Sequence, residues 1–421
     1  MTDRHPEPVA HVELMEQCRL RSLQLLHENL TPEGILAASR TDQAGERGYC
    51  AIFGRDASIC AIGMGISDDP VLAKGALDGL ETLAQHQAPS GQIPNIVDVT
   101  KAQPDFWYVG CIDATLWWLI AVAVLDRHRS QGTLQRHYAA PARRALHWLH
   151  CQEHPTFRLL QQNEASDWAD IMPRTGFVLY TNALWHLVKR LYGLEGAEAT
   201  RENAARLLMP FTADERGDRR SRILASYARE NAQDRGLYLS YLNLATFGDE
   251  GDAFGNALAV LGGLAEGPAE TRVLGSLDAS GVGDVYPMRV TCTPIAKGSR
   301  AWRPYMNRHR QNFAWQYHNG GIWPFAGALW ITALAEAGRN EAASIRLAAL
   351  AGANSLADWG FSEWLHGKTF RPSGMRGQSW NAATYLIAHR AVHQPTPLFR
   401  FTTPIQDSAL PAKPAAHSAF A

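Results

Sequence analysis

The sequence predicts an all-α protein built as an (α/α)6 barrel, a toroid of six inner and six outer helices. Apolar residues recur at three- and four-residue intervals over much of the chain, which is the spacing of an amphipathic helix. Strand-like alternation is scarce, with short candidates at residues 35–38 and 286–290. Six further segments begin alike, with a polar or special residue followed by small and aromatic residues.

The ordinary amphipathic segments are expected to form the outer ring. Such a helix turns its apolar stripe toward the core and its polar face toward water. These helices are predicted at residues 12–30, 70–87, 136–152, 197–212 and 340–356.

The six similar starts are expected to open the inner helices. They fall at intervals that leave room for a helix, a loop, a returning helix and another loop: Asp56, Asp113, Asn182, Asn256, Trp323 and Asn381. Aspartate and asparagine suit helix N-caps, because their side-chain oxygens accept the free N–H groups of the first turn. Pro324 likewise suits a first helical turn. The N-terminal ends of the inner helices would then gather at one mouth of the barrel.

The chain is expected to hold one domain over residues 1–394, followed by a Pro-rich C-terminal tail over residues 395–421 that is docked or disordered. A two-domain helical protein is the alternative for a chain of 421 residues. Nothing in the sequence indicates an oligomeric state.

Charge and apolar content exclude several classes of partner. Lys and Arg number 40 and Asp and Glu number 41, so the formal net charge is −1. Nucleic acids and anionic membranes attract basic surfaces, so neither is an expected partner. No stretch approaches 18 uninterrupted apolar residues, and no membrane span is expected. The six cysteines form no C-x-x-C pair and the N-terminus has no apolar signal region, which predicts buried thiols and a cytoplasmic protein.

Aromatic residues are frequent, with thirteen tryptophans and twelve tyrosines. They serve equally well as core filling or as stacking faces for sugars, whose C–H faces are apolar. Their position beside acids, amides and histidines favours a carbohydrate site. We therefore expect a small-molecule or oligosaccharide substrate.

Two acidic segments precede inner helices and are candidates for catalysis. Residues 164–176 hold three acids, Trp168 and Arg174, and Asp170 is followed by apolar residues that would raise the pKa of its carboxyl. Residues 358–368 place Glu363 between aromatic residues, close to a glycine. Glycoside hydrolysis usually needs two such carboxyl groups, one on each side of the scissile bond. The alternative is that both segments are solvated surface loops.

Residues 315–324 combine two glycines with histidine, asparagine, tyrosine and tryptophan, which favours a binding loop. Residues 54–56 and 103–113 add further polar and aromatic groups at inner-helix starts, although a plain cap with a salt bridge explains Arg55 and Asp56 equally well. Among the sixteen histidines no spacing of metal ligands is convincing, and no Walker A, G-x-S-x-G or H-E-x-x-H motif occurs. No metal or other cofactor is expected.

With these segments in this order, the chain resembles inverting (α/α)6 glycoside hydrolases, of the bacterial amylo-α-1,6-glucosidase type and the neutral/alkaline invertase group. The resemblance runs from about Tyr49 to Val392. Its motifs are Phe53-Gly-Arg-Asp56, Asp113-Ala-Thr-Leu-Trp-Trp118, Asp167-Trp-Ala-Asp170, Tyr317-His-Asn-Gly-Gly-Ile-Trp-Pro324, Ser362-Glu-Trp364 and Gly377-Gln-Ser-Trp380.

The resemblance implies that Asp170 is the general acid, with Asp167 as the fallback, and that Glu363 is the base that activates water. It implies cleavage of an α-glucosidic bond with inversion, with sucrose or another small glycoside as the alternative substrate. The expected substrate-binding residues are Arg55, Asp56, Trp107, Asp113, Trp168, Arg174, Tyr317, His318, Asn319, Trp323, Trp364, Gln378 and Trp380. A sugar epimerase on the same toroid is the alternative from another class, and would use histidines such as His186, His318 and His366.

Overall fold

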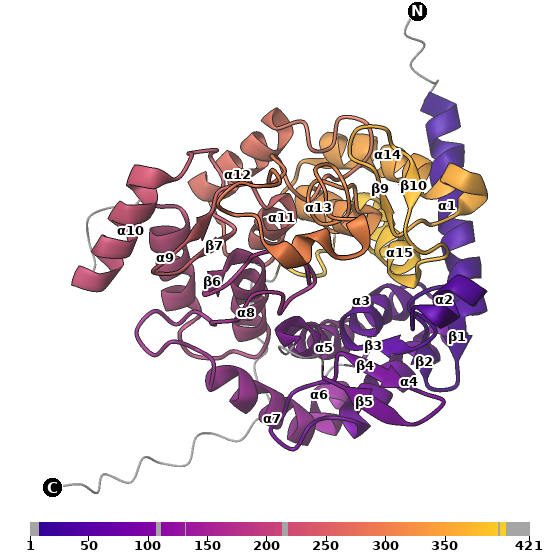
Figure 1. Ribbon diagram of the computed structural model, residues 1–421. Coiled ribbons are helices and arrows are strands. Elements are labelled where there is room, and N and C mark those ends of the chain that lie inside the picture. Colours follow the sequence, from indigo (N-terminus) through magenta and orange to yellow (C-terminus); the bar gives the residue numbers. More distant parts are fainter. Residues whose placement is uncertain (1–7, 107–110, 131, 213–217, 395, 401–421) are drawn as a thin grey trace, which may run out of the picture.

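The computed structural model describes residues 8–106, 111–130, 132–212, 218–394 and 396–400. Within these residues six helices form a closed ring, in which each packs against the next and the last packs against the first (Figure 1). These inner helices are α3 (Gly54–Gly65), α5 (Ile112–Leu125), α8 (Leu179–Leu191), α11 (Ala253–Leu261), α13 (Pro324–Glu336) and α15 (Ser379–His393). The predicted (α/α)6 barrel is confirmed, and every inner helix begins within three residues of its predicted start.

Six outer helices surround the ring, and each packs on at least one inner helix. They are α1 (Pro8–Asn29), α4 (Pro70–Gln85), α7 (Ala139–His150), α9 (Ala197–Leu208), α12 (Pro268–Ala279) and α14 (Asn340–Trp359). Five match the predicted outer helices. The sequence analysis missed α12, whose core contacts come from a short apolar set around Val273, Leu274 and Leu277.

Two inner helices, α5 and α13, are apolar on nearly all sides because they are enclosed by the other helices. Every residue of α5 is buried, as are the residues of α13 from Pro324 to Leu334. A helix that is hydrophobic all round belongs in a core, whereas α7 and α9 keep an exposed polar face. This difference in patterning separates the two rings.

The predicted N-caps are wrong at five of the six inner helices. Asp56, Asp113, Asn182, Asn256 and Asn381 lie inside the first turns, not before them. The Asn182 amide exchanges hydrogen bonds with the backbone of Leu160, and the Asn256 amide does the same with Tyr238. These side chains therefore fix the extended segment that precedes each helix, which is an alternative use of the same hydrogen-bonding groups.

Short antiparallel strands tie the loops at the barrel mouth together. One three-stranded sheet consists of β3 (Ile52–Phe53), β4 (Ile96–Asp98) and β5 (Gln103–Asp105), and a second consists of β6 (Phe177–Val178), β7 (Tyr241–Leu242) and β8 (Phe247–Gly248). Two strand pairs are formed by β1 (Leu30–Thr31) with β2 (Gly34–Ile35) and by β9 (Trp364–Leu365) with β10 (Pro372–Ser373). Strands β3 and β6 lead directly into α3 and α8. Of the two predicted strand candidates, residues 35–38 overlap β2 at Ile35, and in residues 286–290 Arg289 forms an isolated bridge with Ile322.

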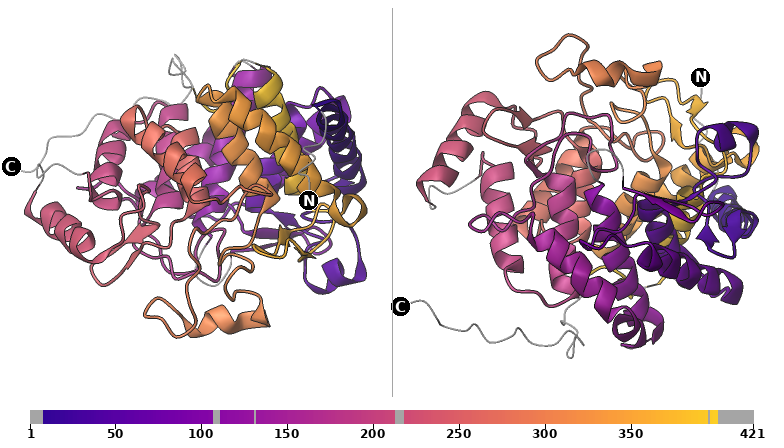
Figure 2. Two further views of the ribbon diagram at one scale, coloured as in Figure 1. Left: turned by 90° about the horizontal axis from the view of Figure 1, so that it is seen from above. Right: turned by 60° about the horizontal axis from the view of Figure 1, so that its bottom comes forward.

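The remaining helical pieces lie in the connections. They are α2 (Asp42–Glu46), α6 (Thr133–His137), α10 (Arg219–Asn231), the π-helical turn η1 (Asp126–Ser130) and the 3₁₀ helix η2 (Pro304–Arg310). In the left view of Figure 2 the orange loop that carries η2 projects from one end of the barrel. In the described part of the chain no helix has the length and apolar character needed to cross a membrane.

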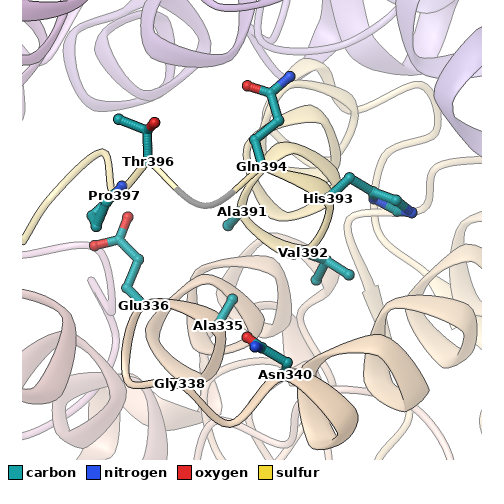
Figure 3. A pocket seen from close by; sticks show the side chains of 10 residues that line it. All are labelled: Ala335, Glu336, Gly338, Asn340, Ala391, Val392, His393, Gln394, Thr396 and Pro397. Atoms are coloured by element: carbon teal, nitrogen blue, oxygen red, sulfur yellow. The ribbon is translucent and has the colours of Figure 1, made fainter.

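The opposite end of the barrel holds a pocket of about 430 Å³ between the C-terminal ends of α13 and α15 (Figure 3). Glu336 points from α13 toward the segment that follows α15. Its carboxylate accepts hydrogen bonds from the backbone N–H groups of Leu398, Phe399 and Arg400. The first residues of the predicted tail, 396–400, are therefore docked on the barrel; residues 395 and 401–421 lie outside the described residues.

The six cysteines are all free thiols. Cys18, Cys60 and Cys111 are buried as predicted. Cys151 is exposed, so the expectation of six buried thiols is wrong there, because this residue follows the last turn of an outer helix.

Candidate active site

The N-terminal ends of the inner helices bring the predicted catalytic segments together at one mouth. We call residues 164–176 the Asp170 segment and residues 358–375 the Glu363 segment. The Asp170 segment leads into α8 and the Glu363 segment lies before α15. The negative charge of Asp170 contributes to raising the pKa of Glu363, so the two carboxyl groups lie within electrostatic range of each other.

Glu363 is held firmly in place. It is 4% exposed, and its two carboxylate oxygens accept hydrogen bonds from the Tyr49 hydroxyl at 2.8 Å and the Met375 backbone N–H at 3.0 Å. Its own backbone N–H donates to the Met375 carbonyl, one step before β9 begins. Burial raises the pKa of Glu363 to about 7, and the two hydrogen bonds act against that rise.

Asp170 lies in a different environment. Its side chain is 41% exposed and makes no hydrogen bond to any described residue, and His318 Nδ1 lies 3.8 Å from its Oδ1. The surrounding protein nevertheless displaces water, and this burial raises the pKa of Asp170 to about 6, while Arg55 and Arg308 lower it. The direction agrees with the apolar surroundings expected from the sequence. Asp170 is thus the carboxyl group that a ligand in the mouth can reach.

The Asp167 carboxylate is fully occupied by hydrogen bonds within the protein. It accepts hydrogen bonds from Arg174 at 2.6 Å, Gln162 at 2.9 Å and the backbone of Ala169 at 2.8 Å. Arg174 also donates to Asp252 at 2.8 Å, and all three charged side chains are buried. Arg174 was expected to bind substrate. Instead, it joins the Asp170 segment to the start of α11.

Arg55 and Asp56 form a charged group in the first turn of α3. Arg55 Nη1 lies 3.2 Å from Asp113, and its Nε lies 3.4 Å from Asp56 Oδ1 without hydrogen-bond geometry. Asp113 is fully buried and also accepts hydrogen bonds from Tyr180 and Cys111. Asp113, which was predicted to bind substrate, therefore holds Arg55 in place. Burial raises the pKa of Asp56 to about 6.

Aromatic rings form the wall between the two segments. Trp168 packs edge-on against His318 and Trp323, and the His318 ring stacks on Trp323. Trp380 stacks on Phe325 with centroids 3.9 Å apart. Such edge-to-face and stacked arrangements give a rigid surface.

Several buried polar atoms of this wall have no hydrogen-bond partner among the described residues. They are both ring nitrogens of His318, the indole nitrogens of Trp168 and Trp380, both amide atoms of Gln378, Asp56 Oδ1 and Arg55 Nε. Native proteins leave few such groups, and a polar ligand in the mouth could satisfy these atoms. Burial, together with Arg174 and Arg55, holds the pKa of His318 well below its ordinary value, so the imidazole is neutral.

Two further predicted residues form hydrogen bonds that hold the loop of residues 315–324. The Asn319 amide was predicted to bind substrate; it is fully buried and is paired with the backbone of Ile295. Trp323 donates its indole N–H to the Tyr317 carbonyl. Tyr317 and Trp364 are buried neighbours at the side of the wall. Trp107 lies outside the described residues.

The backbone is strained in the loop of residues 315–324 and in the Glu363 segment. Trp315 and Tyr317 have φ values of 70° and 44°, and Trp359 and Phe361 have 51° and 39°. Non-glycine residues rarely occupy this region, and such strain gathers at functional sites.

Sequence reasoning missed Tyr49, Asp252 and Gly374. Tyr49 opens the stretch that carries the family resemblance, but no motif marks it. Gly374 has φ +76°, and a side chain there would collide with Glu363 Oε2. Because these contacts cross the chain, spacing alone does not reveal them.

No group of three or more His, Cys, Asp or Glu side chains able to hold a metal ion occurs in the described ranges.

Comparison with known sequences places the likeness in the C-terminal part of the chain. Residues 242–395 match the family described as alkaline and neutral invertase, a match to less than half of the chain. A probable alkaline/neutral invertase F from Arabidopsis thaliana is 33% identical over 150 residues, covering 34% of this chain and 29% of that protein. Cytosolic invertase 1 from Oryza sativa subsp. japonica is 31% identical over 152 residues, covering 35% and 26%. The chain thus matches less than a third of the length of these relatives.

Solved structures share the fold over most of the chain. An uncharacterized conserved protein from Thermus thermophilus is 15% identical, with a TM-score of 0.61, over 89% of this chain and 100% of that one. A GH63 mannosylglycerate hydrolase from the same organism, in complex with Tris and D-glycerate, gives a TM-score of 0.59 at 15% identity over the same shares. The predicted resemblance to invertases and to (α/α)6 glycosidases is confirmed. The matched family segment includes Glu363 but not Asp170.

Proposed function

We propose that this chain is a glycoside hydrolase in which Asp170 is the general acid and Glu363 the general base, acting with inversion on a small glucoside. One observation carries the proposal: the segments at the N-terminal ends of the inner helices hold two carboxyl groups with raised pKa values, of which Glu363 is fixed by two hydrogen bonds and Asp170 is 41% exposed. A pair of this kind is what hydrolysis of a glycosidic bond requires.

Glu363 suits the base because both of its oxygens already accept hydrogen bonds. Those donors favour the ionised carboxylate and fix its direction. In the proposed reaction it removes a proton from a water molecule while the water oxygen bonds to the anomeric carbon.

Asp170 suits the acid because its carboxyl is open to the mouth and has no donor bound to it. It gives its proton to the glycosidic oxygen as the carbon–oxygen bond breaks, so the leaving group departs as an alcohol. We prefer it to Asp167, since three hydrogen bonds, one of them from Arg174, already occupy the Asp167 carboxylate. Solvent then returns the proton from Glu363 to Asp170.

The glycosyl unit is proposed to lie against Arg55, Asp56 and the wall formed by Trp168, His318 and Trp380. Arg55 and Asp56 offer a donor and an acceptor to neighbouring sugar hydroxyls. The neutral His318 can take part in hydrogen bonding without adding charge beside the developing positive charge of the transition state.

Sucrose is the proposed substrate, because the sequence relatives are invertases by name. An α-1,6-glucoside such as isomaltose is the second candidate and rests on the motif order alone. A cytoplasmic location stays a prediction, since the similar plant proteins include one described as cytosolic and one as chloroplastic.

In the described part of the chain, two of the three histidines that a sugar epimerase would use bond backbone groups. His186 bonds the Gly262 carbonyl, and His366 accepts hydrogen bonds from the backbone of Lys368 and Thr369. Their partners are backbone groups of other segments, whereas His318 lies beside Asp170 and Trp168.

Proton NMR of the purified protein with sucrose, isomaltose or maltose, followed from the first minutes, tests the proposal. Inversion of an α-glucoside predicts that β-glucose appears first and then mutarotates. Release of α-glucose first would contradict inversion, and an interconverted monosaccharide without bond cleavage would identify an epimerase. No cleavage of any of the three would contradict the proposed substrate class.

A further inference from the structure

A second pocket lies at the mouth end of the barrel, on the outer side of the Asp170 segment. It has a volume of about 510 Å³, within the range of roughly 300–1,000 Å³ usual for small-molecule sites. Its walls come from the end of α7, the start of α5 and the extended segments on either side of the Asp170 loop. Asp170 and Glu363 are not among its lining residues.

The described lining residues are polar but uncharged. They comprise five carboxamides, two hydroxyls, one indole, one glycine and one isoleucine: Gln152, Gln161, Gln162, Asn163, Asn243, Ser166, Thr175, Trp148, Gly176 and Ile112. A pocket for an anion or a cation would present the opposite charge. Carboxamides instead offer one acceptor and two donor hydrogens each, which matches vicinal hydroxyl groups.

Some of these groups are committed to the fold and others are open. The Gln162 side chain donates to Asp167 and accepts from Thr181, and Asn243 closes a turn through Ala245 and Thr246. By contrast, Gln161 and Asn163 are exposed, and their side chains form no hydrogen bond to any described residue. The Gln152 amide nitrogen donates to the Trp148 carbonyl and leaves its oxygen open to a ligand.

Trp148 supplies an apolar face in the same pocket. It is half-buried at the last turn of α7 and packs against the core with part of its ring. An indole beside open carboxamides offers stacking and hydrogen bonds to one ligand, the combination that a sugar ring requires. We propose that this pocket is a second saccharide-binding site that takes one or two neutral sugar units and is separate from the catalytic mouth.

The proposed site adjoins the catalytic machinery. Gln161 and Asn163 flank Gln162, whose amide holds Asp167, and Asp167 in turn holds the Ala169 backbone next to Asp170. A saccharide bound here would rest on the segment that positions the proposed acid. The proposal concerns binding and does not depend on the hydrolytic activity.

The test is calorimetric titration of the full-length Asp170→Asn variant with sucrose and with maltotriose, because this substitution prevents turnover if Asp170 is the acid. The pocket variant adds Gln161→Ala and Asn163→Ala, which remove open side chains and no described hydrogen bond. The matched control adds Asn340→Ala and Gln394→Ala, two exposed carboxamides in the pocket at the opposite end of the barrel (Figure 3).

Two binding events are expected in the Asp170→Asn protein and in the control. In the pocket variant one of them should weaken at least tenfold. A single event that the pocket substitutions weaken also supports the site and counts instead against sugar binding at the mouth. A single event that they leave unchanged, equal binding in all three proteins, or no binding of either sugar overturns the proposal. Hydrolysis by the unmodified protein reports on the proposed function separately.

Discussion

The Asp170 segment and the Glu363 segment face the same mouth, yet the protein treats their carboxyl groups in opposite ways. Glu363 is fixed through both oxygens and is 4% exposed. Asp170 has no described hydrogen bond and its side chain is 41% exposed, although Asp167, three residues earlier, has three. Within the Asp170 segment, Asp167 thus makes the hydrogen bonds that fix the backbone, and the Asp170 carboxylate makes none to described residues. A base must be aimed at water, whereas an acid must meet a leaving group that arrives from solvent.

The largest expected effect is the loss of activity in Asp170→Asn. The amide cannot donate the proton, so turnover should fall about 10²–10⁴-fold. The free energy of unfolding should change by no more than about 0.5 kcal/mol, because no described hydrogen bond is lost. Initial rates on sucrose and a denaturant titration check both expectations. Turnover within threefold of the unmodified protein would remove Asp170 from the mechanism.

The same substitution three residues earlier should act on stability. Asp167→Asn leaves Arg174 buried with Asp252 as its one remaining carboxylate partner among the described residues. We expect a loss of about 3 kcal/mol in the free energy of unfolding, since the bond from Arg174 loses its charged acceptor and the new amide nitrogen would face the buried Gln162 donor. Denaturant unfolding of the two variants side by side measures the difference. If Asp167→Asn folds with unchanged stability and loses turnover as deeply as Asp170→Asn, the roles of the two aspartates must be exchanged.

A smaller effect is expected at Gly374, which makes room for the Glu363 carboxylate. In Gly374→Ala the new methyl group would displace Glu363 Oε2, and a misplaced catalytic group costs about 10²-fold or less in rate. Gly338→Ala is the matched control, because Gly338 also has φ +76° and no atom lies near its position for a side chain. Both variants should lose about 1 kcal/mol of stability from backbone strain.

Kinetic assays of the two glycine variants distinguish the effect of backbone strain from the effect of the collision with Glu363. A rate loss confined to Gly374→Ala supports the positioning of Glu363. Equal rates in both would show that the carboxylate tolerates displacement and that its fixed geometry has no catalytic role.

The sequence predicted the barrel well because its two rings differ in local pattern. Inner helices such as α5 are apolar on all sides and outer helices such as α4 are amphipathic. Both patterns can be recognised from consecutive residues in the sequence. The caps failed because Asn182 and Asn256 bond backbone segments 18 to 22 residues away. An N-cap and a hydrogen bond to a distant backbone segment use the same amide, and local sequence does not distinguish them.

The sequence predicted which segments form the candidate site, but it did not predict what each residue in them contacts. Acids, tryptophans and glycines cluster in the chain, so the segments could be found. Whether Asp113 meets a sugar or holds Arg55 depends on contacts such as that from Tyr180, 67 residues away. Tyr49 reaches Glu363 across 314 residues, which is why no motif included it.

The smallest and most diagnostic effect is expected in Tyr49→Phe. In the unmodified protein, carboxyl pKa values of about 6 for Asp170 and about 7 for Glu363 predict a bell-shaped profile of kcat/KM with limbs near those values. Between them the pair holds one proton, mostly on Glu363, and the active minority has it on Asp170.

The Tyr49 hydroxyl lowers the pKa of Glu363 by donating to its carboxylate, so its removal should raise that pKa. The alkaline limb then moves to higher pH, and the maximum falls about tenfold per pKa unit, because a smaller fraction of the pair has the proton on Asp170. The acid limb, set mainly by Asp170, should stay in place. A uniform loss of rate without any shift of the alkaline limb would mean that Tyr49 acts on the substrate and not through the Glu363 carboxylate.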